Sequence, residues 1–345
     1  MRRGGSKQTT ERRPRLEEVA ERSGVSTATV SRVLNSPDMV REDTRRRVEA
    51  VVSELGYTPH FGARALASDR TGTIGAVIPT MENAIFARGV QALQEDLAEA
   101  GTTLLVATSG YDPVREEQQI RALLGRGVDG LALIGEERDP AIYEMLVKRG
   151  TPFVLMWTWR EDCPWSCIGF DNRIAAQSMA QRVLTLGHRR IAMIAGIRTG
   201  NDRAEARVQG VSDALTDKGL HLTSATLVEA EYSLEAGAQA ARQLLAVDPR
   251  PTAIICGNDV LAAGALTAIR DAGLSVPGDI SLTGFDDIDL AHVLDPPLTT
   301  VHVPHRRMGQ AAAQRLLAMA AGEAPVKHAS FRTDIVERRS LGPPP

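Results

Sequence analysis

Residues 16–35 constrain the fold of this chain more than any other stretch, because their apolar positions fit two short helices separated by a tight turn. Gly24 permits the sharp reversal, and the hydroxyl of Ser26 can cap the second helix. One face of each helix is apolar, formed by Leu16, Val19 and Ala20 in the first and by Val30, Val33 and Leu34 in the second. The pattern predicts a helix-turn-helix unit.

A third helix is predicted shortly afterwards. Its apolar residues follow the i, i+3, i+4, i+7 spacing of a helix that packs on one side, and they are Val48, Val51, Val52 and Leu55. Three helices packed through these faces are enough to enclose a small core.

The outer face of the second helix suits the major groove of DNA. Arg32 can hold a guanine edge through two hydrogen bonds, and Asn35 is expected to contact phosphate. The other expected contacts are short side chains that can lie flush in the groove: Ser26, Thr27, Ala28, Thr29 and Ser31. The unit is therefore expected to bind double-stranded DNA.

Charge is distributed along the chain in a way that fits this role. Residues 1–70 contain 14 Lys and Arg against 10 Asp and Glu, whereas the remaining residues contain 26 against 33. A basic head beside an acidic body binds phosphates locally and keeps the rest of the protein off DNA. Residues 1–13 lack apolar periodicity and are predicted to be a disordered basic tail.

From residue 73 onward, short apolar runs alternate with amphipathic stretches, as in a parallel sheet flanked by helices. Strands are predicted at 74–79, 103–108, 130–134, 153–156, 191–194, 253–256 and 281–284. Helices are predicted at 86–100, 115–126, 141–148, 174–186, 204–218, 233–245, 260–272 and 308–320. This is too much α/β pattern for one open sheet, so two similar lobes facing across a cleft are expected.

Several other classes of protein are not indicated. Neither the G-x-S-x-G nor the G-x-x-x-x-G-K-[ST] motif occurs, so an enzyme is not expected, and no cofactor is implied. The three cysteines form no CxxC pair and are expected to be reduced thiols. His302 and His305 lack a third ligand, so no metal site is expected. Without a long apolar run or a secretory signal, the chain is expected to be cytoplasmic and not to bind membranes.

The motifs of the head resemble those of the lactose/galactose repressor (LacI/GalR) family. They are Val19-Ala20, Gly24-Val25-Ser26, residues 29–35 and Leu55-Gly56-Tyr57-Thr58-Pro59. In that family the next segment becomes a helix on operator DNA. Ala63 and Leu66 match the residues that pack together there and wedge into the minor groove, which implies a DNA-dependent hinge.

The resemblance continues through the remaining chain and implies a periplasmic-binding-protein-like effector domain. The landmarks include Gly127-Val128-Asp129-Gly130, Leu186-Gly187-His188, Gly257-Asn258-Asp259, Gly284-Phe285-Asp286-Asp287 and Pro297-Leu298-Thr299-Thr300-Val301. Within the family, Gly110-Tyr111-Asp112-Pro113 and Gly169-Phe170-Asp171-Asn172 are most similar to the gluconate-repressor branch.

The implied organisation is an all-α helix-turn-helix head followed by two parallel-sheet α/β lobes. The expected segments are a tail (1–13), a head (14–59), a hinge (60–71) and an effector-binding and dimerisation domain (72–345). The N-lobe is expected to comprise about 72–170 and 299–327, and the C-lobe about 171–298 and 328–345.

Positions that line the effector pocket in the family correspond here to Phe86, Trp157, Phe170, Arg207, Tyr232, Asn258 and Asp286. This set offers the planar hydrogen-bonding groups, aromatic face and cation that sugars and sugar acids require. The alternative interpretations are core packing for Phe86, Phe170 and Tyr232, a lid packed against the opposite lobe for Trp157, a surface salt bridge for Arg207 and a helix cap for Asp286.

Trp157 is a departure, because sugar-binding relatives often have an aspartate there. The indole removes a carboxylate near Arg207, which favours an anionic, gluconate-like sugar acid over a galactoside-like ligand.

Two functions are compatible with these observations. The first is a ligand-responsive repressor of carbohydrate or sugar-acid catabolic genes, which binds a near-palindromic operator as a homodimer and is released by a small-molecule effector. The second is a cytoplasmic carbohydrate-binding or carbohydrate-modifying protein whose helical head contacts something other than DNA. The basic head, with Arg32 and Leu66, favours the repressor.

Overall fold

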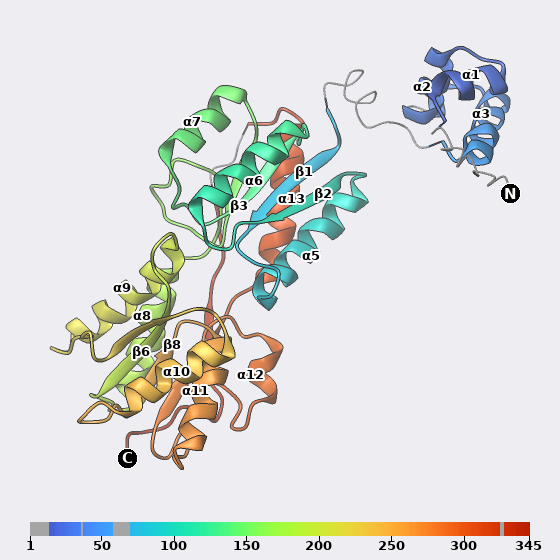
Figure 1. Ribbon diagram of the computed structural model, residues 1–345. Helices are drawn as coiled ribbons and strands as arrows, with labels where there is room; N and C mark the ends of the chain where they lie inside the picture. The colour runs from blue at the N-terminus through green and yellow to red at the C-terminus, as the bar shows by residue number, and fades with distance from the viewer. Residues whose placement is uncertain (1–13, 36, 58–69, 325–327) are drawn as a thin grey trace, which may run out of the picture. The chain divides into compact units, whose positions relative to one another are not determined.

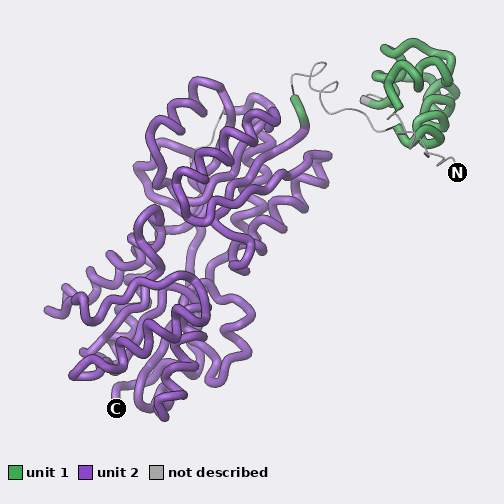
Figure 2. Tube along the Cα trace, viewed as in Figure 1, with its two compact units in different colours: residues 1–71 green, residues 72–345 purple. Residues whose placement is uncertain are grey.

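The computed structural model describes residues 14–35, 37–57, 70–324 and 328–345. The chain forms two compact units, residues 1–71 and 72–345, each of which is described by itself (Figure 2). The predicted tail and most of the predicted hinge, including Ala63 and Leu66, lie outside the described residues.

The first unit is the predicted three-helix head (Figure 1). Its helices are α1 (Leu16–Ser23), α2 (Thr27–Asn35) and α3 (Glu42–Leu55), with a short 3-10 turn, η1, at Pro37–Met39. The core between them contains Val19, Ala20, Val30, Val33, Val48 and Tyr57. The predicted apolar faces therefore share one core.

The turn between α1 and α2 has the predicted chemistry. Gly24 adopts a left-handed φ of 64°, which a residue without a side chain accepts at no steric cost. The backbone N–H of Thr29 donates to Oγ of Ser26 at 3.2 Å, so Ser26 caps α2 as predicted.

The second unit begins with a six-stranded sheet in the order β11-β5-β4-β3-β1-β2, in which all neighbours are parallel. Its strands are β1 (Thr73–Ile78), β2 (Thr103–Thr108), β3 (Gly130–Ile134), β4 (Phe153–Met156), β5 (Cys167–Gly169) and β11 (His328–Ser330). Helices α5 (Ala84–Glu99) and α13 (His305–Ala320) cover one face, and α6 (Pro113–Gly125) and α7 (Pro140–Arg149) cover the other. This is the N-lobe.

The C-lobe is built on a second parallel sheet in the order β7-β6-β8-β9. Its strands are β6 (Ile191–Gly196), β7 (Leu227–Ala230), β8 (Ala253–Cys256) and β9 (Ser281–Thr283). Helices α8 (Asn172–Thr185) and α9 (Asp202–Thr216) pack on one face, and α10 (Leu234–Leu245) and α11 (Asp259–Asp271) on the other. A short helix, α12 (Asp289–Val293), follows β9. Two α/β lobes are thus confirmed.

One predicted lobe boundary is wrong. β11 pairs in parallel with β5, with His328 opposite Cys167, so residues 328–330 belong to the N-lobe sheet and not to the C-lobe. The chain then runs through β12 (Asp334–Val336), which pairs antiparallel with β10 (Thr300–His302). The last crossing between lobes therefore follows β11, because the open edge of β5 accepts one more strand.

The predicted strands agree with the structure to within two residues at each end. Six segments, each of three to five residues, were not predicted, namely β5, β7, β10, β11, β12 and α12. A segment this short is recognised from sequence most readily where it is a continuous apolar run, as in β3, β4 and β8. Among the described helices, none combines the length and apolarity needed to span a bilayer.

Candidate functional site

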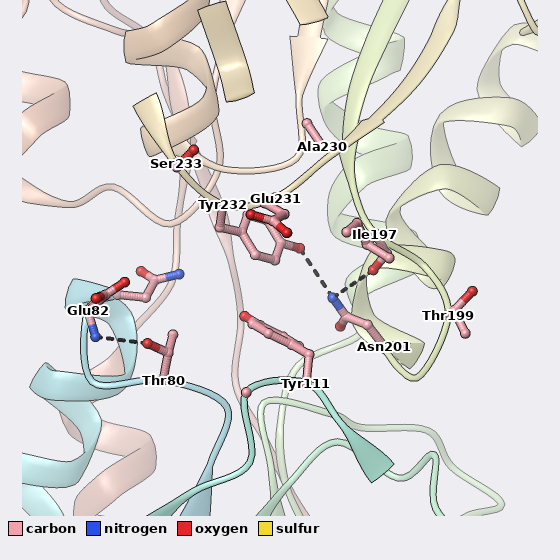
Figure 3. A pocket seen from close by; sticks show the side chains of 12 residues that line it. Thr80, Glu82, Tyr111, Ile197, Thr199, Asn201, Ala230, Glu231, Tyr232 and Ser233 are labelled. Atoms are coloured by element: carbon pink, nitrogen blue, oxygen red, sulfur yellow. Dashed lines mark hydrogen bonds between the residues drawn. The ribbon is translucent and has the colours of Figure 1, made fainter. Parts of the chain in front are cut away.

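An open cavity of about 450 Å³ lies between the lobes. Figure 3 shows its lining, with Thr80, Glu82 and Tyr111 contributed by the N-lobe and Asn201 and Tyr232 by the C-lobe. The remaining lining residues are Asn83, Gly110, Ile197, Thr199, Ala230, Glu231 and Ser233. We call this space the outer cavity.

A smaller space of about 20 Å³, the inner cavity, adjoins it and is of the size that holds one water molecule. Its lining residues are Asn83, Ile85, Phe86, Tyr111, Trp157, Asn201, Arg203, Arg207, Tyr232, Asn258 and Asp286. Tyr111 and Tyr232 line both cavities, with ring centroids 5.9 Å apart, and Asn201 Nδ2 donates to the Tyr232 hydroxyl at 3.5 Å (Figure 3). The two tyrosines therefore mark the boundary between the cavities.

Six of the seven residues predicted for the effector site line the inner cavity. Phe170 is the exception, and this prediction is corrected. Its ring stacks on Phe285, with centroids 6.0 Å apart, and only 1% of Phe170 is exposed. Phe285 in turn lies under Arg207, so Phe170 supports the site from the core without lining either cavity.

Arg207 is held in place by bonds within the protein. Its Nε donates to Oδ1 of Asn172 at 2.9 Å, and Nη1 donates to the carbonyl of Gly257 at 2.6 Å. The guanidinium lies 3.8 Å from the ring centroid of Phe285, and Nη2 is 3.7 Å from Oδ1 of Asp286. Arg207 is 5% exposed, so the alternative of a surface salt bridge is wrong.

Asp286 is buried with unused hydrogen-bonding capacity. Both carboxyl oxygens are inaccessible to solvent and accept no hydrogen bond from the described residues. Burial raises the pKa of Asp286 to about 7, and the charge of Arg207 opposes this shift. The helix-cap interpretation is wrong, because α12 starts at Asp289 after Ile288. A ligand that donates hydrogen bonds would satisfy this carboxyl.

Trp157 forms a wall of the inner cavity, and its own polar group is already satisfied. The indole N–H donates to Nδ1 of His305 at 3.0 Å, and the ring meets Phe86 edge-on at 5.4 Å. The carbonyl of Trp157 accepts from Nδ2 of Asn172, the residue that also holds Arg207. His305, which the sequence offered only as a candidate metal ligand, thus lies behind this wall.

The other five residues that line the inner cavity were not among the predicted site residues: Asn83, Ile85, Tyr111, Asn201 and Arg203. A usable signal existed for two of them. Asn83 caps α5 and Asn201 caps α9, just as the predicted Asn258 caps α11. An asparagine at the junction of a parallel strand with the next helix lies at the sheet edge where ligands bind.

The charges of the cleft are more balanced than the sequence suggested. Arg207 faces Asp286, and Nη1 of Arg203 bonds Oδ1 of Asp202 at 2.6 Å. The outer cavity contains Glu82 and Glu231 and neither lysine nor arginine. The positive charge of the cleft is therefore confined to Arg203 and Arg207 of the inner cavity, each beside a carboxylate.

In the head, the predicted DNA-facing residues lie together on α2 and its cap. Ser26, Thr27, Ala28 and Arg32 are exposed, and Thr29 and Ser31 are half-buried. Asn35 is the last residue of α2. The exposed side of α2 therefore offers short side chains and one guanidinium, as a major-groove helix does.

Two family models match the chain. Residues 15–60 match the bacterial regulatory proteins of the lacI family, and residues 180–341 match the periplasmic binding protein-like domain. The matches coincide with the head and with most of the C-lobe.

Full-length relatives agree with these matches. The repressor PurR of Photobacterium profundum is 32% identical over 88% of this chain and 90% of its own length. The regulator GntR of Escherichia coli is 33% identical over 90% and 93%, and the ribose operon repressor of Haemophilus influenzae is 34% identical over 88% and 90%. The chain is thus similarly distant from regulators with three different names.

Solved structures have the same fold. A LacI-family regulator from Silicibacter pomeroyi has a TM-score of 0.87 at 28% identity, covering 95% of this chain and 99% of that one. The lac repressor dimer bound to operator and the anti-inducer ONPF has a TM-score of 0.84 at 28% identity, covering 96% and 100%.

Proposed function

Since this chain belongs to the lacI family of bacterial regulatory proteins, and is a DNA-binding, ligand-responsive repressor, we propose that its effector is a hydroxyl-rich small molecule, a sugar or sugar acid. The observation that carries this proposal is Asp286, which is buried in the cleft and whose carboxyl oxygens accept no hydrogen bond from the part of the chain that the structure describes. Ligand hydroxyls are neutral donors that satisfy such a carboxyl.

The neighbouring groups complete a site for hydroxyls. Asn258 uses its Oδ1 to accept from Leu261 N at 2.8 Å, which leaves Nδ2 as a donor in the inner cavity. Arg207 presents Nη2 beside Asp286. A hydroxyl can therefore donate to Asp286 and accept from Arg207 or Asn258, while Trp157 packs against C–H groups. The carboxylate of a sugar acid would face Arg207, away from the glutamates of the outer cavity.

Ligand binding would act through contacts that join the lobes. The backbone N–H of Glu136 donates to Oδ2 of Asp202 at 2.8 Å, and Arg88 forms an ion pair with Asp289 at 2.5 Å. A ligand held by residues of both lobes alters these contacts, which would change the separation of the hinges in a dimer. We propose that the effector weakens operator binding, and reciprocally that operator weakens effector binding by the same factor.

The proposed working unit is a homodimer on a near-palindromic operator in the cytoplasm, without enzymatic activity. One three-helix head makes too few contacts for operator specificity, so two heads are needed. The lac repressor to which the chain is similar is a dimer on its operator. Sedimentation velocity should show a dimer with and without DNA, and a stable monomer or tetramer would contradict this assignment.

A thermal-shift screen of the full chain against sugars, sugar acids and phosphosugars tests the effector class. We expect a hydroxyl-rich compound to raise the melting temperature of the wild type and to have no such effect on Asp286→Asn. Asp217→Asn, an exposed change at the end of α9, is the matched control and should respond like the wild type. A ligand without hydroxyls, or equal stabilisation of Asp286→Asn, would contradict the proposal.

A further inference from the structure

Two of the three cysteines, expected from the sequence to be reduced thiols, lie in contact. Cys163 belongs to the loop that joins β4 to β5, and Cys167 is the first residue of β5. The thiol of Cys167 donates to Sγ of Cys163 at 2.7 Å, and both side chains are buried. The third cysteine, Cys256, lies in β8 of the other lobe.

The surroundings make the two thiols unequal. The hydrogen bond from Cys167 lowers the pKa of Cys163, assisted by the backbone N–H of Trp165 and the charge of Arg160, although burial and Glu136 oppose the shift. The same hydrogen bond and burial raise the pKa of Cys167. Cys163 therefore ionises to the thiolate more readily than Cys167 does. Cys167 is close enough to attack the oxidised sulfur of Cys163.

A cavity lies beside the loop that carries Cys163. A cavity of about 520 Å³ is lined by Arg160, Pro164 and Trp165, which are neighbours of Cys163 in the same loop. The side chain of Arg160 is 45% exposed and forms an ion pair with Glu136 across this cavity. The loop that carries Cys163 is therefore exposed to solvent at Arg160, three residues before the buried thiol.

We propose that Cys163 and Cys167 are a site of reversible oxidation, at which a hydroperoxide forms a disulfide between the β4–β5 loop and the first residue of β5. The Cys163 thiolate attacks the peroxide, its sulfur bonds to one oxygen, and the O–O bond breaks to release hydroxide or an alkoxide. Cys167 then attacks Sγ of the resulting sulfenic acid, the S–S bond forms, and water leaves. Overall, the two thiols lose two electrons and two protons. Hydrogen peroxide is reduced to two water molecules, and an alkyl hydroperoxide is reduced to one water molecule and one alcohol.

The position of the loop links this chemistry to the cleft. The loop begins after Trp157, which lines the inner cavity, and its Arg160 holds the side chain of Glu136. The backbone N–H of Glu136 bonds Asp202 of the C-lobe. The disulfide would therefore form in the segment that connects the cavity wall with a contact between lobes.

Thiol counting and peptide mapping on the full chain test the proposal. Treatment with a modest excess of hydrogen peroxide should lower the count from three thiols to one and remove two hydrogen atoms from the mass. The mapped crosslink should join Cys163 to Cys167, and dithiothreitol should restore all three thiols. Because the mapping uses wild-type protein, the result does not depend on whether a variant folds.

Matched variants sharpen the test. Cys256→Ala removes the buried thiol of the other lobe and should oxidise like the wild type, whereas Cys163→Ser and Cys167→Ser should form no intramolecular disulfide. In Cys167→Ser the sulfenic acid of Cys163 should persist long enough for trapping by dimedone. Unchanged thiols in peroxide-treated wild type, a crosslink that involves Cys256, or dimedone labelling of Cys167 in Cys163→Ser with none in Cys167→Ser would overturn the proposal.

Discussion

The indole N–H of Trp157 donates to Nδ1 of His305 at 3.0 Å, and so joins the end of β4 to the first residue of α13. Because an indole can only donate, Nδ1 of His305 accepts and the ring proton is on Nε2, 3.3 Å from the carbonyl oxygen of Asp286. Burial lowers the pKa of His305 to about 3, so the ring stays neutral. A neutral imidazole thus ties the cavity wall to the backbone of the residue proposed to bind the effector.

The close packing of Trp157 against Gly89 predicts that a substitution at Gly89 lowers stability. A Cβ at Gly89, in α5, would overlap the indole ring of Trp157, which is 1% exposed and fixed by His305. Gly89→Ala should therefore lower the free energy of unfolding by about 1–3 kcal/mol, as overpacked cores do. Chemical denaturation of the full chain measures this change.

A glycine elsewhere provides the control for this prediction. Gly125→Ala places its Cβ in open space at the end of α6 and should leave stability unchanged or slightly higher. The double variant Gly89→Ala/Trp157→Phe should recover part of the loss, since the smaller ring frees the contact. Additive effects of the two substitutions would show that the indole is not the obstacle.

Asp286 should make effector affinity depend on pH. Its folded-state pKa is about 7, and a hydroxyl that donates to the carboxyl favours the charged form. Binding therefore releases a proton, and affinity should rise on the order of tenfold between pH 6 and pH 8. Isothermal titration across this range measures the change, and an affinity that falls with pH would contradict the assigned role.

The same group should affect stability with the opposite sign. Because the folded pKa lies above the ordinary value of about 4, the folded chain keeps a proton that the unfolded chain loses as pH rises. This contribution is complete below about pH 4 and is lost by about pH 7. The melting temperature of Asp286→Asn minus that of the wild type should therefore increase as pH rises from 4 to 7.

Arg32 should read a base, whereas Asn35 should only position the head. With an operator selected from random duplexes, Arg32→Ala should cost roughly 1–3 kcal/mol and relax the preference at one base pair per half-site. Asn35→Ala should weaken binding to operator and random DNA alike. Equal losses on both kinds of DNA for Arg32→Ala, measured by fluorescence anisotropy, would remove its assignment as the base-reading residue.

The hinge and the cleft should be separable by mutation. Leu66, outside the described residues, is predicted from the family resemblance to wedge into the operator, which costs a few kcal/mol of unstacking. Leu66→Ala should lose most of its specific affinity for DNA yet still bind effector. Arg207→Ala should bind operator with normal affinity, and effector should not change that affinity. Titrations of both variants test this, with melting curves to confirm folding. Normal, effector-sensitive operator binding by Leu66→Ala would contradict the hinge mechanism.

Local features of the sequence were enough to predict the elements of the fold. The spacing of Val30 and Val33, the left-handed turn at Gly24 and the cap at Ser26 each involve neighbours within a few residues, and all are present in the head. The strands of four or more residues followed from apolar runs, apart from β7. These features are predictable because helical and strand periods repeat over distances shorter than one element.

The tertiary structure decided the contacts between distant segments. Trp157 and His305 are 148 positions apart, and no period relates them. Phe170 lies in the core and not in the cavity, because Phe285 and Arg207 stack above it. Cys163 contacts Cys167 because the loop folds back to the start of β5. Sequence determined which residues form each helix and strand, whereas the packing of whole lobes determined which side chains share a cavity, since such contacts depend on every intervening element.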